Sequence, residues 1–240
     1  MTSWSIRFNN EFTDIMDDEA YAKHCHQILH EREDMHPFIG DSRHYYIIRD
    51  AAMDVRGVPG LFCEIGLRKG GGTKIMMDAV IQSGKPRTVI AIDPYGTIPY
   101  EGMEGEHRER TEYSSEMQKD TLEKMYRFVA QHPNINFVYF PLEDTEFMKR
   151  YSDGVPVYVE GDKSVVNEYA LVHFDGPHTV DTVMKETKFF DERTGTGAMF
   201  VYDDVEHFYD HDQVENFLFE KNWHLIEKTI SKASYRKIIW

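Results

Sequence analysis

The stretch Gly60 to Thr73, GLFCEIGLRKGGGT, constrains the fold of this 240-residue chain more than any other. It begins with a short apolar run typical of a parallel strand that is buried on both faces: Leu61, Phe62, Cys63 and Ile65. A glycine loop follows, made by Gly66, Gly70, Gly71 and Gly72, and Thr73 is placed to open a helix over 74–83. The order of strand, glycine loop and helix predicts an α/β unit whose backbone can approach a ligand closely.

Glu64 interrupts the apolar run near the carboxyl end of the predicted strand. A carboxylate is costly to bury there unless something donates hydrogen bonds to it, which points to a polar ligand at this edge. The spacing E-x-G-x-x-x-G-G-G fits neither the dinucleotide fingerprint G-x-G-x-x-G nor a P-loop, because Thr73 precedes Lys74. An ordinary tight turn between strand and helix remains the alternative.

Further strands and helices alternate along the chain. Apolar runs predict strands over 88–92, 135–140, 169–174 and 197–202, and helical periodicity predicts helices over 43–53, 115–131 and 179–192 and around Val214 to Leu218. The last segments, 223–228 and 234–240, indicate an antiparallel hairpin. We therefore expect an α/β fold with a Rossmann-like, mostly parallel seven-stranded sheet and helices on both faces. A single domain over 1–240 is expected, with a helical cap at 1–59 and the catalytic core at 60–240.

Acidic residues follow the second and third of these strands. Asp93 comes directly after the strand 88–92, where folds of this kind bind ribose hydroxyls. Glu143 and Asp144 follow the strand 135–140. The charged segment 97–114 suits either a mobile lid beside a ligand or a plain solvated insertion.

A second group of acidic residues follows the fourth and fifth strands: Asp175, Asp203 and Asp204, with His178 close behind Asp175. The carboxyl ends of neighbouring parallel strands meet at one edge, so these side chains should lie together. Adjacent carboxylates repel one another unless a cation sits among them, and oxygen ligands favour Mg²⁺. The alternative is that these aspartates only cap the helices that follow them.

Composition narrows the class of partner. The formal net charge of -15 argues against nucleic acid or an anionic membrane as the partner, because both attract clustered Lys and Arg. A small molecule is expected instead. Cys25 and Cys63 are the only cysteines, and Cys63 lies in a predicted core strand, so a disulfide framework is not expected. The absence of an apolar signal region predicts a cytoplasmic protein. The segment before about residue 40 is interpreted as a cap or as a contact between copies in a homo-oligomer.

The motif E-I-G-L-R-K-G-G-G-T resembles the first motif of class I S-adenosylmethionine (SAM) dependent methyltransferases. Together with I-D-P-Y-G, F-D-G-P-H-T and V-Y-D-D-V, it resembles the magnesium-dependent O-methyltransferases of the macrocin and mycinamicin type, which methylate sugar hydroxyls. The similarity covers roughly residues 60–221.

The resemblance implies a role for each matching residue. The residues expected to contact SAM are Glu64, Gly66, Gly70, Thr73, Asp93, Glu143 and Asp144. Those expected to hold Mg²⁺ are Asp175, Asp203 and Asp204, and the expected catalytic residues are His178, as general base, and Asp175. The predicted function is Mg²⁺-dependent transfer of the SAM methyl group to a hydroxyl of a small acceptor, such as a sugar or another polyol. A nicotinamide-dependent oxidoreductase and a non-catalytic SAM-binding protein are the alternatives.

Overall fold

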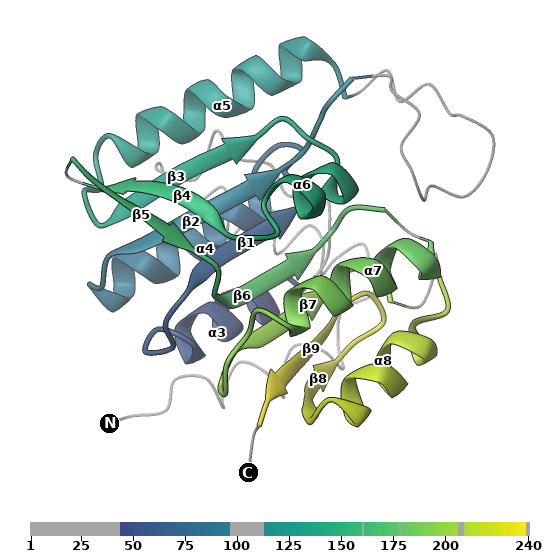
Figure 1. The fold of residues 1–240 in the computed structure, drawn as a ribbon. Helices are drawn as coiled ribbons and strands as arrows, with labels where there is room; N and C mark the ends of the chain where they lie inside the picture. The colour runs from purple at the N-terminus through teal and green to yellow at the C-terminus, as the bar shows by residue number, and fades with distance from the viewer. Residues whose placement is uncertain (1–43, 97–112, 160, 178, 206–208, 239–240) are drawn as a thin grey trace, which may run out of the picture.

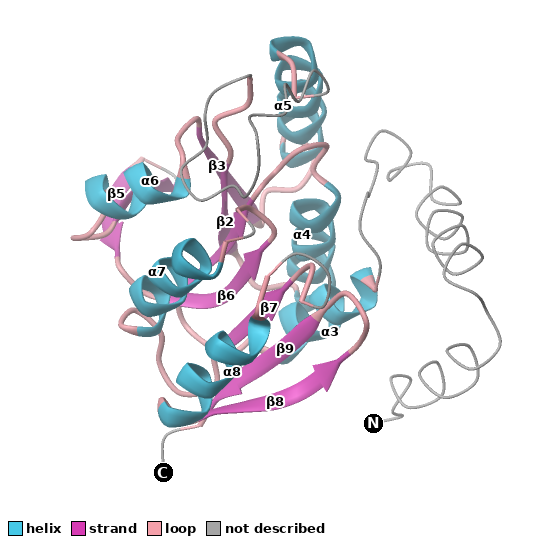
Figure 2. Cartoon of the chain, turned by 90° about the vertical axis from the view of Figure 1, so that its right-hand side faces the viewer, coloured by secondary structure: helices cyan, strands magenta, loops and turns pink. Residues whose placement is uncertain are grey.

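The protein forms three layers, with a central sheet between two layers of helices (Figures 1 and 2). The structure is a computed structural model, and it describes residues 44–96, 113–159, 161–177, 179–205 and 209–238. The expected cap before residue 44 and most of the segment 97–114 therefore lie outside the described residues. No helix in the described ranges is long and apolar enough to cross a membrane.

The central sheet has seven strands in the order β3-β2-β1-β6-β7-β9-β8. The parallel strands are β1 (Leu61–Ile65), β2 (Arg87–Ile92), β3 (Ile135–Phe140), β6 (Tyr169–Phe174) and β7 (Met199–Tyr202). The hairpin of β8 (Trp223–Lys228) and β9 (Ala233–Lys237) completes the sheet, with β9 antiparallel to β7. The predicted fold class is confirmed. Strand order reverses between β1 and β6, which is where open α/β sheets bind ligands.

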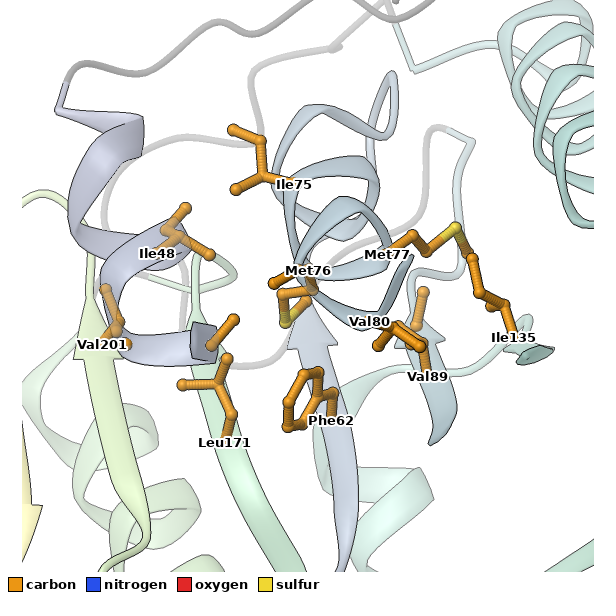
Figure 3. Packing of buried hydrophobic residues seen from close by; sticks show 14 of the residues in the cluster. Ile48, Phe62, Ile75, Met76, Met77, Val80, Val89, Ile135, Leu171 and Val201 are labelled. Carbon is orange, nitrogen blue, oxygen red and sulfur yellow. The ribbon is translucent and has the colours of Figure 1, made fainter. Parts of the chain in front are cut away.

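Each face of the sheet is covered by helices (Figure 2). One layer contains α3 (Tyr45–Asp54), α4 (Gly71–Ser83) and α5 (Ser115–Val129), and the other contains α6 (Asp144–Arg150), α7 (Val180–Asp191) and α8 (His211–Glu220). The alternation of side chains along β1 supplies both cores, because Phe62 packs toward α4 while Leu61 and Cys63 pack toward α7. Figure 3 shows Met76 and Val80 of α4 beside Phe62 in the first core.

The elements differ from the predicted ones in two ways. The helix predicted to open at Thr73 begins at Gly71, with Gly70 at the N-cap position, so Thr73 lies inside the first turn. A separate two-stranded sheet, β4 (Val155–Val159) and β5 (Asp162–Val166), has no counterpart in the sequence analysis. β4 contributes Val155 and Val157 to the core, whereas β5 is mostly exposed and only its last residue, Val166, packs against that core, so its apolar pattern is weak. The helix predicted at 43–53 is α3, and its Ile47 and Ala51 are buried.

Candidate functional site

Several of the predicted site residues lie just beyond the carboxyl ends of the parallel strands, at one edge of the sheet. The residue that follows each of four parallel strands donates its backbone N–H to the last residue of the strand beside it. These bonds join Asp93 to Phe140 (3.1 Å), Gly66 to Ile92 (2.9 Å), Asp175 to Ile65 (3.0 Å) and Asp203 to Phe174 (2.9 Å). The structure thus brings the glycine loop and the acids of both predicted groups onto one edge, on both sides of the point where strand order reverses.

Gly66 occupies a position that no other residue can fill without a rearrangement. Its φ of +88° lies in the region that favours glycine, and a Cβ atom there would lie 1.9 Å from the carbonyl oxygen of Asp175. The close approach of the two loops across the strand ends therefore depends on the missing side chain.

Glu64 holds the glycine loop onto β1. Its Oε2 accepts hydrogen bonds from the backbone N–H of Thr73 (2.8 Å) and from the Thr73 hydroxyl. Its Oε1 lies 2.9 Å from Nδ1 of His173, the residue opposite it on β6. A Cβ atom on Gly72 would lie 1.9 Å from Oε1, so a glycine is needed beside the carboxylate. The hydrogen bonds that the buried Glu64 requires, for which a polar ligand was expected, come from within the protein.

His173 is a site residue that the sequence analysis missed. It is fully buried, and its Nε2 has no hydrogen-bond partner among the residues that the structure describes. The available signal was a polar residue in the otherwise apolar strand YALVHF, in register with the only acid of β1. Buried polar side chains on neighbouring strands are expected to pair.

Asp93 fixes the start of the glycine loop. One of its carboxylate oxygens accepts a hydrogen bond from the backbone N–H of Arg68 (2.8 Å), and the other accepts one from the backbone N–H of Tyr95 (2.9 Å). Burial raises the pKa of Asp93 to about 6, although the two N–H groups favour its charged form. The Arg68 carbonyl in turn accepts hydrogen bonds from the hydroxyls of Tyr95 and Thr121. Asp93 therefore ties the ends of β1 and β2 together.

The second acidic group includes a cation that the sequence analysis did not anticipate. Asp203 is buried, and its Oδ2 lies 2.5 Å from Nζ of Lys232, which is also buried. Its Oδ1 accepts the backbone N–H of Asp204 at 2.9 Å. Asp204 has φ +56°, an uncommon conformation for a residue other than glycine, and both Asp204 and Asp175 are half-buried.

The helix-cap alternative for these aspartates is wrong. The N-cap of α7 is Thr179, whose hydroxyl accepts the backbone N–H of Thr182, and the N-cap position of α8 is Asp210. Asp175 and the pair Asp203–Asp204 therefore do not serve as caps of these two helices. Their backbones follow adjacent strands at one edge. The expected close grouping of their carboxylates is not observed, because among the described residues the ligand atoms within 4.8 Å of one another belong to Glu64, His173 and Asp175.

Glu143 and Asp144 stand at the start of α6, after β3. Asp144 is buried, and a hydrogen bond links its side chain to the buried Glu186 of α7. Burial and the neighbouring Asp144 raise the pKa of Glu186 well above its usual value, which favours the protonated form of this carboxyl group. Glu143 is half-buried and is the more accessible of the two predicted cofactor contacts.

His178, the predicted general base, lies outside the described residues. Its neighbours on both sides, Pro177 and Thr179, are described, and they connect the end of β6 to the first turn of α7.

Two other features could mark a ligand site. Ligand atoms of Glu64, His173 and Asp175 lie within 4.8 Å of one another and could hold a metal ion. Glu64 and His173 are already joined by a hydrogen bond, and Mg²⁺ prefers oxygen ligands to imidazole. A hollow of about 400 Å³ lies at the opposite edge of the sheet, near the strand starts at Leu61 and Thr88. It is remote from the acids at the carboxyl ends, so we place no chemistry in it.

No protein-family model and no curated protein sequence matches the chain. Solved structures do. The O-methyltransferase NovP is 19% identical, with a TM-score of 0.57 over 81% of this chain and 79% of NovP. CalS11, a calicheamicin methyltransferase that is also described as a TDP-rhamnose 3'-O-methyltransferase, is 13% identical, with a TM-score of 0.56 over 80% of this chain and 77% of CalS11. The chain shares the fold of these methyltransferases.

A third O-methyltransferase, TomG from Streptomyces achromogenes, is 11% identical, with a TM-score of 0.51 over 93% of this chain and 91% of TomG. TomG takes part in tomaymycin synthesis, and its structure contains SAM. The methyltransferase fold confirms the architecture that the resemblance implied. At these identities the comparison establishes the fold, and the chemistry has to be argued from the site.

Proposed function

We propose that this protein transfers the methyl group of SAM to a hydroxyl group of a small molecule, such as a sugar or another polyol. The observation that carries the proposal is the position of Gly66 and Asp93 at the ends of adjacent strands, beside the point where strand order reverses. In an O-methyltransferase fold, this is where a nucleoside-containing cofactor is expected.

The residue types at the carboxyl ends of the strands indicate which part of SAM each residue would contact. Asp93 can accept hydrogen bonds from ribose hydroxyls, since each carboxylate oxygen keeps a lone pair beyond the one used by Arg68 or Tyr95. The loop containing Gly66 and Gly70 is proposed to pass under the methionine part of SAM. Glu64 and Thr73 act on that loop through their mutual hydrogen bonds, and Glu143 and Asp144 are proposed to lie near the adenine.

The second acidic group fits a hard divalent cation in the chemistry of its donors. Asp175, Asp203 and Asp204 offer carboxylate oxygens, the donors that Mg²⁺ prefers, and they follow adjacent strands at one edge of the sheet. We propose these three residues as the ligands of Mg²⁺. When bound, the ion would supply Lewis-acid activation of the acceptor hydroxyl.

Residues of the chain itself would align the acceptor hydroxyl and remove its proton. Methyl transfer breaks the bond between sulfur and the methyl carbon as the bond from the acceptor oxygen to that carbon forms, and the hydroxyl proton must leave. The edge between Gly66 and Asp175 would hold the hydroxyl in line with the methyl group. His178 is proposed to take the proton, and Asp175 is the alternative base.

Calorimetric titration with SAM and with NAD tests the cofactor. We expect SAM to bind and NAD not to bind. Asp93→Ala should weaken SAM binding by about 1–3 kcal/mol, as for a lost charge-assisted hydrogen bond. Affinity in the wild type should be higher at pH 7 than at pH 5, because Asp93 has a pKa of about 6 and is charged above it. Asp120→Ala, at an exposed helical position, is the matched control.

Transfer of a labelled methyl group to a panel of sugars and other polyols tests the reaction, with and without a chelator. Unchanged SAM affinity in Asp93→Ala would reject the cofactor assignment, and full transfer after exhaustive chelation would remove Mg²⁺ from the mechanism.

A further inference from the structure

The ion pair between Lys232 and Asp203 places a cation inside the acidic group at the sheet edge. The two charged atoms lie 2.5 Å apart, and the exposed fractions of the side chains are 0% for Lys232 and 2% for Asp203. Taking two charges out of water costs several kcal/mol for each ion, so a pair this deeply buried requires good geometry to persist.

The turn that carries Lys232 is held in place on several sides. It joins β8 to β9, and it is closed by hydrogen bonds between Thr229 and Lys232 in both directions. The next residue back, Ser231, accepts the backbone N–H of Val205 at 3.2 Å, and its hydroxyl lies 2.8 Å from Nδ1 of His44. The ammonium also lies 5.4 Å from the centre of the Tyr45 ring, a cation–π contact. This hydrogen-bonded turn therefore positions Lys232 beside Asp203.

The charge balance of the acidic group follows from this placement. Asp175, Asp203 and Asp204 carry three formal negative charges on neighbouring strand ends, and Lys232 supplies one positive charge at the most buried of them. The repulsion that argued for a cation among these acids is thus partly relieved within the chain. A divalent ion bound to the same group would be repelled by the ammonium.

We propose that Lys232 is a permanent counter-cation of this group, a positioning residue that holds Asp203 in place without a metal ion and limits the affinity for one. The inference rests on the proposed Mg²⁺ site. The ammonium and the divalent ion would therefore act on the same carboxylate. Without the ammonium, the stability of the buried Asp203 charge should depend on the divalent ion.

Lys232→Met tests the proposal, because Met keeps much of the side-chain volume and removes the charge. In EDTA, the variant should unfold at a lower temperature than the wild type. Saturating Mg²⁺ should raise its unfolding midpoint by more than it raises that of the wild type. Calorimetric titration with Mn²⁺ should show binding at least about tenfold tighter than in the wild type.

Two further variants separate charge from packing. Lys232→Arg keeps the positive charge and should respond to Mg²⁺ as the wild type does. Lys74→Met removes the other fully buried lysine that has a recorded ion pair, with Asp78 at 2.7 Å on α4, and should be destabilised equally with and without Mg²⁺.

Equal midpoint shifts in the wild type and Lys232→Met, including no shift in either, would overturn the proposal. If Lys232→Met does not fold in EDTA, recovery on refolding with Mg²⁺ is the expected result and no recovery is the contrary one. The double variant Asp203→Asn/Lys232→Met removes both charges of the pair, so no unpaired charge stays buried. It should be more stable in EDTA than Lys232→Met. SAM binding to the wild type is a separate readout, and its failure would reject the proposed function without deciding the role of Lys232.

Discussion

At the residue scale, single atoms decide how closely the strand ends approach one another. The glycine loop was predicted from its residue types, yet its four glycines do different things. Gly70 occupies the N-cap position of α4 with φ +82°, and Gly72 leaves space for the Glu64 carboxylate. Gly66 faces the backbone of Asp175, which cannot move aside as a flexible side chain could.

Gly66→Ala should therefore be among the most costly single substitutions in the chain. We expect it to lower the free energy of unfolding by about 2–4 kcal/mol, since it combines left-handed strain with a backbone clash. Urea unfolding measures this. Gly57→Ala is the control, because a Cβ atom there would meet nothing within 4 Å, and it should stay within about 0.5 kcal/mol of the wild type. Similar losses in the two variants would contradict the steric argument.

At the element scale, the C-terminal hairpin needs an anchor to present Lys232 to the sheet edge. Asp191, at the end of α7, supplies one at the other end of the strands. Its Oδ1 accepts hydrogen bonds from the Trp223 indole (2.9 Å) and from the Lys237 ammonium (2.8 Å), the first and last residues of the hairpin. Trp223 also stacks on Phe200 of β7 with ring centres 3.9 Å apart. Helix and hairpin are thus joined by a buried polar contact.

Removing this anchor should loosen the hairpin. Asp191→Ala leaves the indole N–H without its acceptor and removes the carboxylate partner of a partly buried ammonium, which keeps only the carbonyl of residue 191 and the Thr194 hydroxyl. We therefore expect a loss of about 3 kcal/mol in the free energy of unfolding. The neighbouring Glu192, whose side chain is 74% exposed, forms a looser pair with Arg193 at 3.4 Å. Glu192→Ala should cost less than about 1 kcal/mol. If the two variants are equally stable, Asp191 does not anchor the hairpin.

At the scale of the whole molecule, buried titratable groups set the pH dependence of stability. The raised pKa values of Asp93 and Glu186 mean that the folded protein holds more protons than the unfolded chain between the ordinary and the raised values. Their contribution to stability therefore falls as pH rises through that window. Burial lowers the pKa of His211 to about 4, so its contribution rises with pH from about 4 to 6.5. Asp93 and His211 therefore oppose each other between about pH 4 and 6, and Glu186 adds to the effect of Asp93.

Glu186→Gln should expose this effect, because it removes an acid whose pKa is raised in the folded protein. We expect the stability of the variant relative to the wild type to increase with pH, by up to about 1.4 kcal/mol for each pH unit. Urea unfolding at pH 5, 6, 7 and 8 gives the comparison. Glu123→Gln, on an exposed face of α5, should change by the same amount at every pH. A constant difference between Glu186→Gln and the wild type would show that Glu186 is charged in the folded state.

Much of the fold could be predicted because the strands are short apolar runs with clear breaks. Asp93, Asp175 and Asp203 follow such runs directly, so their placement on one edge needed only the geometry of parallel strands. The hairpin of β4 and β5 was missed, because β5 lies largely in solvent and its sequence, DKSVV, has little apolar signal. The end of α4 was predicted correctly and its start was not, since Thr73 serves Glu64 instead of capping the helix.

The sequence by itself determined the sheet, the glycine loop and the row of acids, because periodicity and strand ends are local properties of the chain. Only the tertiary structure decided which charges meet. Glu64 contacts His173 on the neighbouring strand, Asp144 contacts Glu186 on α7, and Asp203 pairs with Lys232 in the turn between the last two strands. Each partner lies far away along the chain, and a buried charge is stabilised by whichever partner the packing brings within hydrogen-bond distance, which no local pattern records.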